Sequence, residues 1–159
     1  MSDLRVRVAD YAVGKAPIVI STIGLGSCVA ITIYDRQARI GGMAHILLPS
    51  EGLSRDKDNR AKFPGTAVPL LLEEMKKLGA RGPYTAKIAG GSSMFGALIP
   101  AGGINMGERN VVSSRQALTE AGIPLAGQDV GGDYGRSVYF HLDDGRVLVR
   151  SLKSGDRAL

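Results

Sequence analysis

One cysteine and a nearby histidine are the side chains of this sequence best suited to chemistry. Cys28 is the only cysteine among the 159 residues, so it cannot close an intramolecular disulfide, and one sulfur cannot build a thiolate metal cage. It is therefore either an inert buried thiol or a nucleophile. A nucleophilic thiol needs a group that accepts its proton, and His45, which ends the segment Gly-Gly-Met-Ala-His, is a candidate base.

The residues around Cys28 predict how such a pair would be positioned. Cys28 follows Gly-Leu-Gly-Ser at residues 24–27, which predicts a tight turn with the thiol at its mouth. Neighbouring antiparallel strands can bring Cys28 and His45 within hydrogen-bond distance. Thr22 lies on the strand before the turn, where its hydroxyl could bond the other imidazole nitrogen. The three residues would then be nucleophile, base and orienting group.

A structural interpretation of the same residues stays open. A single cysteine beside a strand often serves as a small buried hydrophobic side chain. His45 is flanked by Met43, Ala44 and Ile46, and could be a core histidine whose hydrogen bonds are satisfied internally. The only other histidine, His141, falls in a predicted hairpin and is a weaker candidate.

Two glycine-rich stretches, residues 90–93 and 131–135, raise the question of phosphate binding. Neither ends in the glycine-lysine-serine/threonine of a Walker loop, and neither has the spacing of a dinucleotide fingerprint. Asp133 would also repel a phosphate. We interpret both stretches as tight turns at the margin of a sheet that could line a cleft.

Hydrophobic periodicity predicts two helices among several strands. An apolar stripe predicts a helix over residues 66–78, with Pro69 in its first turn and Gly79 at its end. Asn105 and Glu108 have capping-box spacing and predict a helix over residues 105–121. Residues 50–64 are polar and predict a mobile loop. The predicted strands cover residues 18–22, 29–34, 40–48, 87–89 and 124–130, and a hairpin pairs 137–142 with 146–152.

Length and composition place the chain in a broad class. A chain of 159 residues fits one domain, and strands joined by short turns favour an α+β fold, a layered α/β sandwich with a mixed sheet. The net charge of +5 comes from scattered basic residues, and the chain has five tyrosines, three phenylalanines and no tryptophan. Neither feature is typical of a nucleic-acid interface.

An uncharged segment, residues 16–34, approaches the length of a membrane span. Leu-Gly-Ser-Cys at residues 25–28 also loosely resembles a lipoprotein cleavage box, in which Cys28 would be lipidated. Against both interpretations, Asp3 and Asp10 lie where a positively charged leader belongs, and polar residues and glycines interrupt the apolar run. We therefore expect a cytoplasmic protein that is not inserted in a membrane and keeps a reduced thiol.

Taken together, the motifs resemble the CheD family of chemoreceptor glutamine deamidases over residues 10–152, nearly the whole chain. The resemblance is carried by Thr22-Ile-Gly-Leu-Gly-Ser-Cys28-Val-Ala, Gly41-Gly-Met-Ala-His45, Thr66-Ala-Val-Pro-Leu-Leu-Leu-Glu-Glu-Met75, Ala86-Lys-Ile-Ala-Gly-Gly91, Met94-Phe95, Gly107-Glu-Arg-Asn110 and Asp129-Val-Gly-Gly-Asp-Tyr-Gly-Arg-Ser137. Relatives more often carry an aspartate where this chain has Gly65, so the start of the first helix is expected to differ.

The resemblance implies a function and a catalytic trio. It implies a single deamidase domain over residues 1–159, with Cys28, His45 and Thr22 as catalytic residues and no metal or organic cofactor. The fold would be similar to that of cytotoxic necrotising factor-type deamidases. The implied reaction converts glutamine to glutamate on the cytoplasmic helices of methyl-accepting chemoreceptors, under regulation by the phosphatase CheC. Two alternatives share these residues: a non-catalytic partner of CheC, and a thiol hydrolase that acts on receptor methyl esters.

Overall fold

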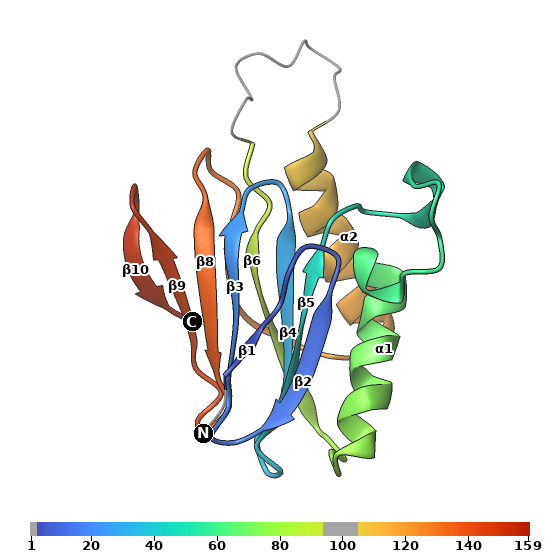
Figure 1. The fold of residues 1–159 in the computed structure, drawn as a ribbon, viewed down its shortest axis with the longest axis vertical. Helices are drawn as coiled ribbons and strands as arrows, with labels where there is room; N and C mark the ends of the chain where they lie inside the picture. The colour runs from blue at the N-terminus through green and yellow to red at the C-terminus, as the bar shows by residue number, and fades with distance from the viewer. Residues whose placement is uncertain (1–2, 94–104) are drawn as a thin grey trace.

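The computed structural model describes residues 3–93 and 105–159. In chain order the elements are β1 (Leu4–Arg5), β2 (Tyr11–Lys15), β3 (Val19–Leu25), β4 (Val29–Asp35), β5 (Ile40–Ile46), the 3-10 turns η1 (Glu51–Leu53) and η2 (Arg60–Lys62), α1 (Pro64–Lys77), β6 (Tyr84–Gly90), α2 (Met106–Glu120), β7 (Leu125–Val130), β8 (Arg136–His141), β9 (Val147–Ser151) and β10 (Gly155–Ala158) (Figure 1).

The strands form two five-stranded sheets. The first has the order β1-β3-β8-β9-β10 and the second β2-β5-β4-β6-β7. Each is mixed, since β1 runs parallel to β3 and β6 parallel to β7 while the other pairs are antiparallel. The predicted α+β class with a mixed sheet is therefore confirmed. The expectation of one sheet is wrong, because β3 leaves the sheet of β4 and β5 and pairs with β8.

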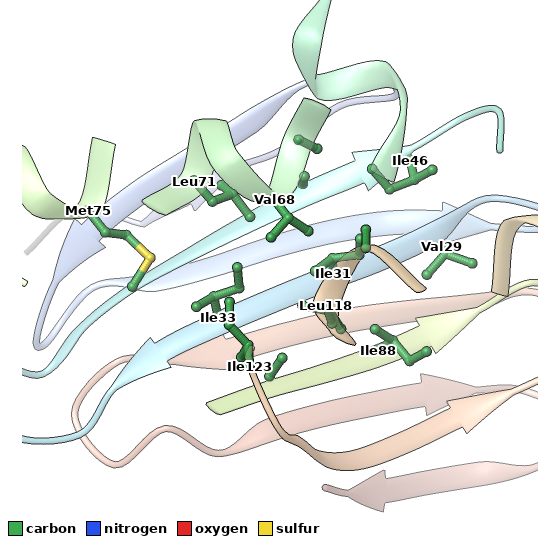
Figure 2. Packing of buried hydrophobic residues seen from close by; sticks show 14 of the residues in the cluster. Val29, Ile31, Ile33, Ile46, Val68, Leu71, Met75, Ile88, Leu118 and Ile123 are labelled. Carbon is green, nitrogen blue, oxygen red and sulfur yellow. The ribbon is translucent and has the colours of Figure 1, made fainter. Parts of the chain in front are cut away.

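The molecule has three layers, in which the second sheet lies between the first sheet and the two helices (Figure 1). Successive residues of a strand point to opposite faces, and β4, buried along its whole length, serves both. Its Val29, Ile31 and Ile33 face α1 and α2, where they contact residues such as Leu71 and Leu118 (Figure 2). We call this cluster the helix-covered core.

The opposite face of β4 packs against the first sheet. Cys28, Ala30 and Tyr34 lie there with Val138 and Phe140 of the first sheet, and we call this cluster the inter-sheet core. Small residues let the sheets approach closely. A Cβ added to Gly41 of β5 would lie 2.6–2.8 Å from Leu142 and Phe140 atoms.

The first helix begins earlier than predicted. Pro64 occupies its first turn behind the N-cap Phe63, whose side chain makes no cap bond, and the fixed φ of proline suits that place. Pro69 is therefore not in the first turn, as predicted, but inside the helix, on its exposed side. The predicted end of this helix is confirmed, since Gly79 takes a φ of +111° just beyond the C-cap Leu78.

The second helix matches its prediction. The Asn105 side chain accepts a hydrogen bond from the Glu108 N–H at 3.1 Å, and the helix runs to Glu120. Residues 50–64 are not a plain loop, because η1 and η2 lie within them. The predicted turn at residues 24–27 is shorter than expected: β3 continues over a bulge to Leu25.

Three strands were not predicted. Two of them, β1 and β10, are short, and β10 is exposed throughout, so neither has the alternating apolar pattern of a half-buried strand. In the third, β2, the only buried residue is Gly14, so the strand has no buried apolar side chain. The predicted C-terminal hairpin is confirmed: the Gly145 N–H donates to the His141 carbonyl at 2.8 Å.

Candidate active site

Cys28 lies at the end of the inter-sheet core, immediately before β4. Its side chain is packed with that core and the residue is 9% exposed. The alternation along β4 explains this orientation, because Val29 faces the helices and its predecessor must face the first sheet. The thiol is thus nearly buried at a strand end, where the chain turns.

His45 lies on the same face of the neighbouring strand β5. It is directly opposite Ala30 in the antiparallel ladder, so Cys28, two residues before Ala30, occupies the diagonal position. Diagonal pairs on one face are within reach of long side chains. His45 is 1% exposed, and its Nε2 has no hydrogen-bond partner among the residues that the structure describes. No thiol–imidazole hydrogen bond is formed in this state.

Thr22 reaches His45 from the other sheet. Its Oγ1 lies 2.7 Å from His45 Nδ1, and the same oxygen donates to the Val6 carbonyl, also at 2.7 Å. A hydroxyl has a single proton, and the carbonyl can only accept. The proton between Thr22 and His45 therefore belongs to Nδ1, which leaves Nε2 with a free lone pair, as a base requires. The predicted contact between Thr22 and His45 is confirmed, although the bond crosses from one sheet to the other.

Burial favours the neutral form of both Cys28 and His45. It lowers the pKa of His45 from 6.5 to about 4, and it raises the pKa of the Cys28 thiol. Desolvation disfavours the charged form of each group, so at neutral pH the resting site holds a thiol and a neutral imidazole. Proton transfer would then have to accompany attack on a substrate.

The backbone around Cys28 is held from two sides. The Gly91 N–H donates to the Cys28 carbonyl at 2.8 Å, and the Ser92 N–H donates to the Gly26 carbonyl at 2.9 Å. Gly90 permits this approach, because its φ is +112° and an added Cβ would lie 2.3 Å from the Cys28 oxygen. The glycine-rich stretch at residues 90–93 is therefore a packing element of the site.

The carbonyl of Ser27 is bonded from α2. Asn110 is fully buried, and its Nδ2 donates to the Ser27 carbonyl at 2.9 Å and to the Leu47 carbonyl at 3.2 Å. No acceptor for the Cys28 N–H lies within residues 3–93 and 105–159. Within these ranges the Cys28 N–H is thus a backbone donor without a hydrogen bond, next to the thiol.

The remaining candidates lie elsewhere or have structural roles. Residues 131–132 line a hollow of about 320 Å³ together with Gly91, Asn105 and Glu108, in agreement with turns that line a cleft. His141 pairs with Val19, three residues from Thr22 along β3, and does not join the trio. The motif at residues 94–95 lies outside the described residues.

Two further tests concern metals and membranes. Within the described ranges, no three histidine, cysteine or acidic residues gather in a way that could hold a metal ion. Among the same residues, no helix is long and apolar enough to cross a membrane.

Sequence reasoning missed the roles of Val6 and Asn110. Val6 acts through its backbone carbonyl, which leaves no signal in the residue type. Asn110 lies on the buried side of α2 with Val111, Ser114 and Leu118. A polar amide within an apolar helix face is a signal that could have indicated a buried hydrogen-bonding role.

Comparisons with known proteins agree on one family. The model of the family described as "CheD chemotactic sensory transduction" matches residues 47–151. A "Probable chemoreceptor glutamine deamidase CheD" of Caldanaerobacter subterraneus is 44% identical over 153 residues, which are 96% of this chain and 94% of that protein. The "Chemoreceptor glutamine deamidase CheD" of Thermotoga maritima is 44% identical over 151 residues, 94% and 92% of the two chains. A probable CheD of Pyrococcus abyssi is 43% identical over 154 residues, 96% and 94%.

Proposed function

The chain belongs to the CheD family, and on that premise we propose that it is a cysteine-dependent protein-glutamine deamidase. Its substrates would be glutamine side chains of methyl-accepting chemoreceptors, which it converts to glutamate with release of ammonia. The observation that carries the proposal is the 2.7 Å contact between Thr22 and His45. Because Thr22 also donates to the Val6 carbonyl, this contact puts the imidazole proton on Nδ1 and leaves a lone pair on Nε2. His45 and Cys28 lie on the same face of the second sheet.

The first half of the reaction forms a thioester. His45 Nε2 accepts the thiol proton while Cys28 Sγ attacks the carboxamide carbon and forms a C–S bond. The carbonyl oxygen becomes an oxyanion, to which the Cys28 N–H would donate; such a donor is worth about 3 kcal/mol. The protonated His45 then gives its proton to the nitrogen, the C–N bond breaks, and ammonia leaves.

The second half hydrolyses the thioester. Neutral His45 accepts a proton from water, whose oxygen attacks the thioester carbon, and the C–S bond then breaks. The proton returns to Cys28, and glutamate is released. Because burial lowers the pKa of His45 to about 4, the imidazole is regenerated as a base at neutral pH after each proton transfer. Thr22 keeps the ring in one tautomer throughout.

The wider proposal rests on the family. It takes residues 1–159 as one CheD-like deamidase domain that acts in the cytoplasm without a metal or organic cofactor. The receptor helices would be its substrate and CheC its regulatory partner, and its sandwich would be related to that of cytotoxic necrotising factor-type deamidases. These features are supported by the identity to CheD proteins over more than nine tenths of the chain.

The test is a deamidation assay on a chemoreceptor cytoplasmic fragment, read by peptide mass spectrometry. The wild type is expected to convert glutamine to glutamate, and Cys28→Ala to lose activity by on the order of 10³-fold or more. Thermal unfolding of both proteins and their binding to the fragment serve as controls, because alanine fits the site of a small buried thiol.

Each other result points to a different function. Conversion by both proteins would remove Cys28 as the nucleophile. Binding without conversion by the folded wild type would favour a non-catalytic partner of CheC. Release of methanol from a methylated fragment, with glutamines unchanged, would favour a thiol hydrolase acting on methyl esters.

A further inference from the structure

Asn110 is a buried polar residue whose contacts converge on the peptide bond that precedes Cys28. It belongs to the second turn of α2 and is 0% exposed. Its two amide protons are both used, one on the Ser27 carbonyl and one on the Leu47 carbonyl. These contacts also settle which end of the amide carries nitrogen, since a flipped side chain would set oxygen against two oxygens.

Both contacts lie where the ladder between β4 and β5 ends. The last pair of that ladder is Val29 with Ile46. Beyond it the Leu47 N–H turns to the Lys62 carbonyl, so Ser27 and Leu47 have no ladder bond to each other. The Asn110 amide bonds to both carbonyls instead. It thereby joins the start of β4, next to Cys28, to the end of β5, which bears His45.

The contact with Ser27 has a consequence for Cys28. The Ser27 carbonyl and the Cys28 N–H belong to one planar trans peptide group and point in opposite directions. Holding the carbonyl therefore fixes the direction of the N–H. A hydrogen bond to the carbonyl also polarises the peptide group and strengthens its N–H as a donor.

The unmade bonds of the site favour a functional explanation. Asn110 Oδ1 is buried and has no partner among the described residues, so the side chain bears the cost of one unmade hydrogen bond while it makes two others. The Cys28 N–H likewise has no acceptor within the described ranges. The amide thus donates both of its protons to carbonyls at the site, and the N–H of the peptide that it orients is without an acceptor in the described part of the chain.

We propose that Asn110 is a positioning residue that fixes the Ser27–Cys28 peptide group, so that the Cys28 N–H is aimed at the oxyanion formed when the thiol attacks a carbonyl. The inference deepens the proposed function, on which its role with glutamine rests. Its test, however, uses reagents that need no receptor.

Two reagents separate oxyanion stabilisation from thiol reactivity. p-Nitrophenyl acetate acylates Cys28 through a tetrahedral oxyanion and releases p-nitrophenolate, while the thiol proton goes to His45. Iodoacetamide alkylates the same sulfur by direct displacement of iodide, without an oxyanion. Rates with Cys28→Ala are subtracted to remove acylation of other groups.

Asn110→Ala is expected to slow acylation of Cys28 by on the order of 10-fold or more, an effect smaller than the 10²–10³-fold seen when such a donor is deleted outright. Alkylation and its pH profile are expected to stay within about threefold of wild type, since no oxyanion forms there. The matched control is Ser113→Ala, because Ser113 Oγ also ties α2 to a carbonyl, that of Pro49 at 2.6 Å. That variant is expected to change neither rate.

Equal losses in both reactions, or no loss in either, would overturn the proposal, since a merely structural role predicts one of these. If Asn110→Ala does not fold, the wild type still decides: the Cys28 amide proton should shift downfield in the NMR spectrum when the thiol forms a hemithioacetal with an aldehyde. An unmoved signal would overturn the proposal. If Asn110→Ala slows acylation but not alkylation, and the wild type leaves receptor glutamines intact, the result would instead contradict the proposed function alone.

Discussion

The two cores on either side of the central sheet are built from the same strand and have different chemistry. The helix-covered core is mainly aliphatic, with Ile31, Leu71 and Leu118 fully or almost fully buried, and buried polar residues border it on α2. The inter-sheet core borders on buried polar side chains, among them Thr22 and His45. Thr22 and His45 come from different sheets and satisfy each other by pairing across the interface. The comparison teaches that both faces of β4 bury apolar side chains, whereas the proposed catalytic groups lie on only one of them.

The largest effect on stability is expected in the helix-covered core. Leu71→Ala should lower the free energy of unfolding by about 2–5 kcal/mol, because a fully buried leucine leaves a cavity when truncated. Alkylation of Cys28 by iodoacetamide in the folded variant should stay at the wild-type rate. Urea unfolding measures the first quantity, and Leu72→Ala, whose side chain is only partly buried, should lose less. A large change in thiol reactivity would break the separation between the two cores.

The second prediction concerns pH and the inter-sheet core. An unfolded histidine takes up a proton near pH 6.5, whereas the folded His45 does so only at about 4. The unfolded state binds more protons between these values, so stability falls as the pH falls through that window and is unaffected by His45 above it. The loss amounts to about 3 kcal/mol.

Urea unfolding at several pH values checks this dependence. His45→Gln should lose that part of the dependence on pH, while carboxylates titrate alike in both proteins. Parallel stability curves for the variant and the wild type would contradict a buried neutral imidazole.

The third prediction separates the hydroxyl of Thr22 from its shape. Thr22→Val leaves His45 Nδ1 and the Val6 carbonyl without partners, at a cost of about 1–3 kcal/mol. Acylation of Cys28 by p-nitrophenyl acetate should fall on the order of 10- to 100-fold, since the ring loses its fixed tautomer. Thr22→Ser, which keeps the hydroxyl, should remain near wild type. Equal rates for the two variants would show that Thr22 does not orient His45.

The smallest effect is expected at another polar contact between the sheets. Tyr34 of β4 donates its hydroxyl proton to the Leu142 carbonyl at 2.7 Å, at a distance along the strand from Cys28. Tyr34→Phe should lower stability by about 1 kcal/mol and leave acylation of Cys28 unchanged. A drop in acylation would mean that the inter-sheet core acts as a unit, which would extend the reactive region beyond the trio.

Local sequence patterns were enough to predict several elements. The apolar stripe of α1 and the Asn105 cap of α2 predicted both helices to within two residues, because helix period and capping act over one or two turns. The β-branched run of β4 was equally readable. The error at Pro69 has the same local origin, since proline suits a first turn and the structure instead uses Pro64 there.

The sequence by itself determined the kinds of residue that could react, namely a lone cysteine, a histidine and a threonine in recognisable segments, and it determined the helices around them. Only the tertiary structure decided that β3 belongs to the first sheet, so that Thr22 contacts His45 of the second sheet across the interface. It also decided that the Val6 carbonyl sets the tautomer and that Asn110 holds the peptide before Cys28. These contacts join residues distant in the chain, and two of them use a backbone carbonyl, a group that every residue type shares. The placement of Thr22 before the turn was enough to predict its contact with His45, whereas spacing along the sequence did not indicate the contacts with the Val6 and Ser27 carbonyls.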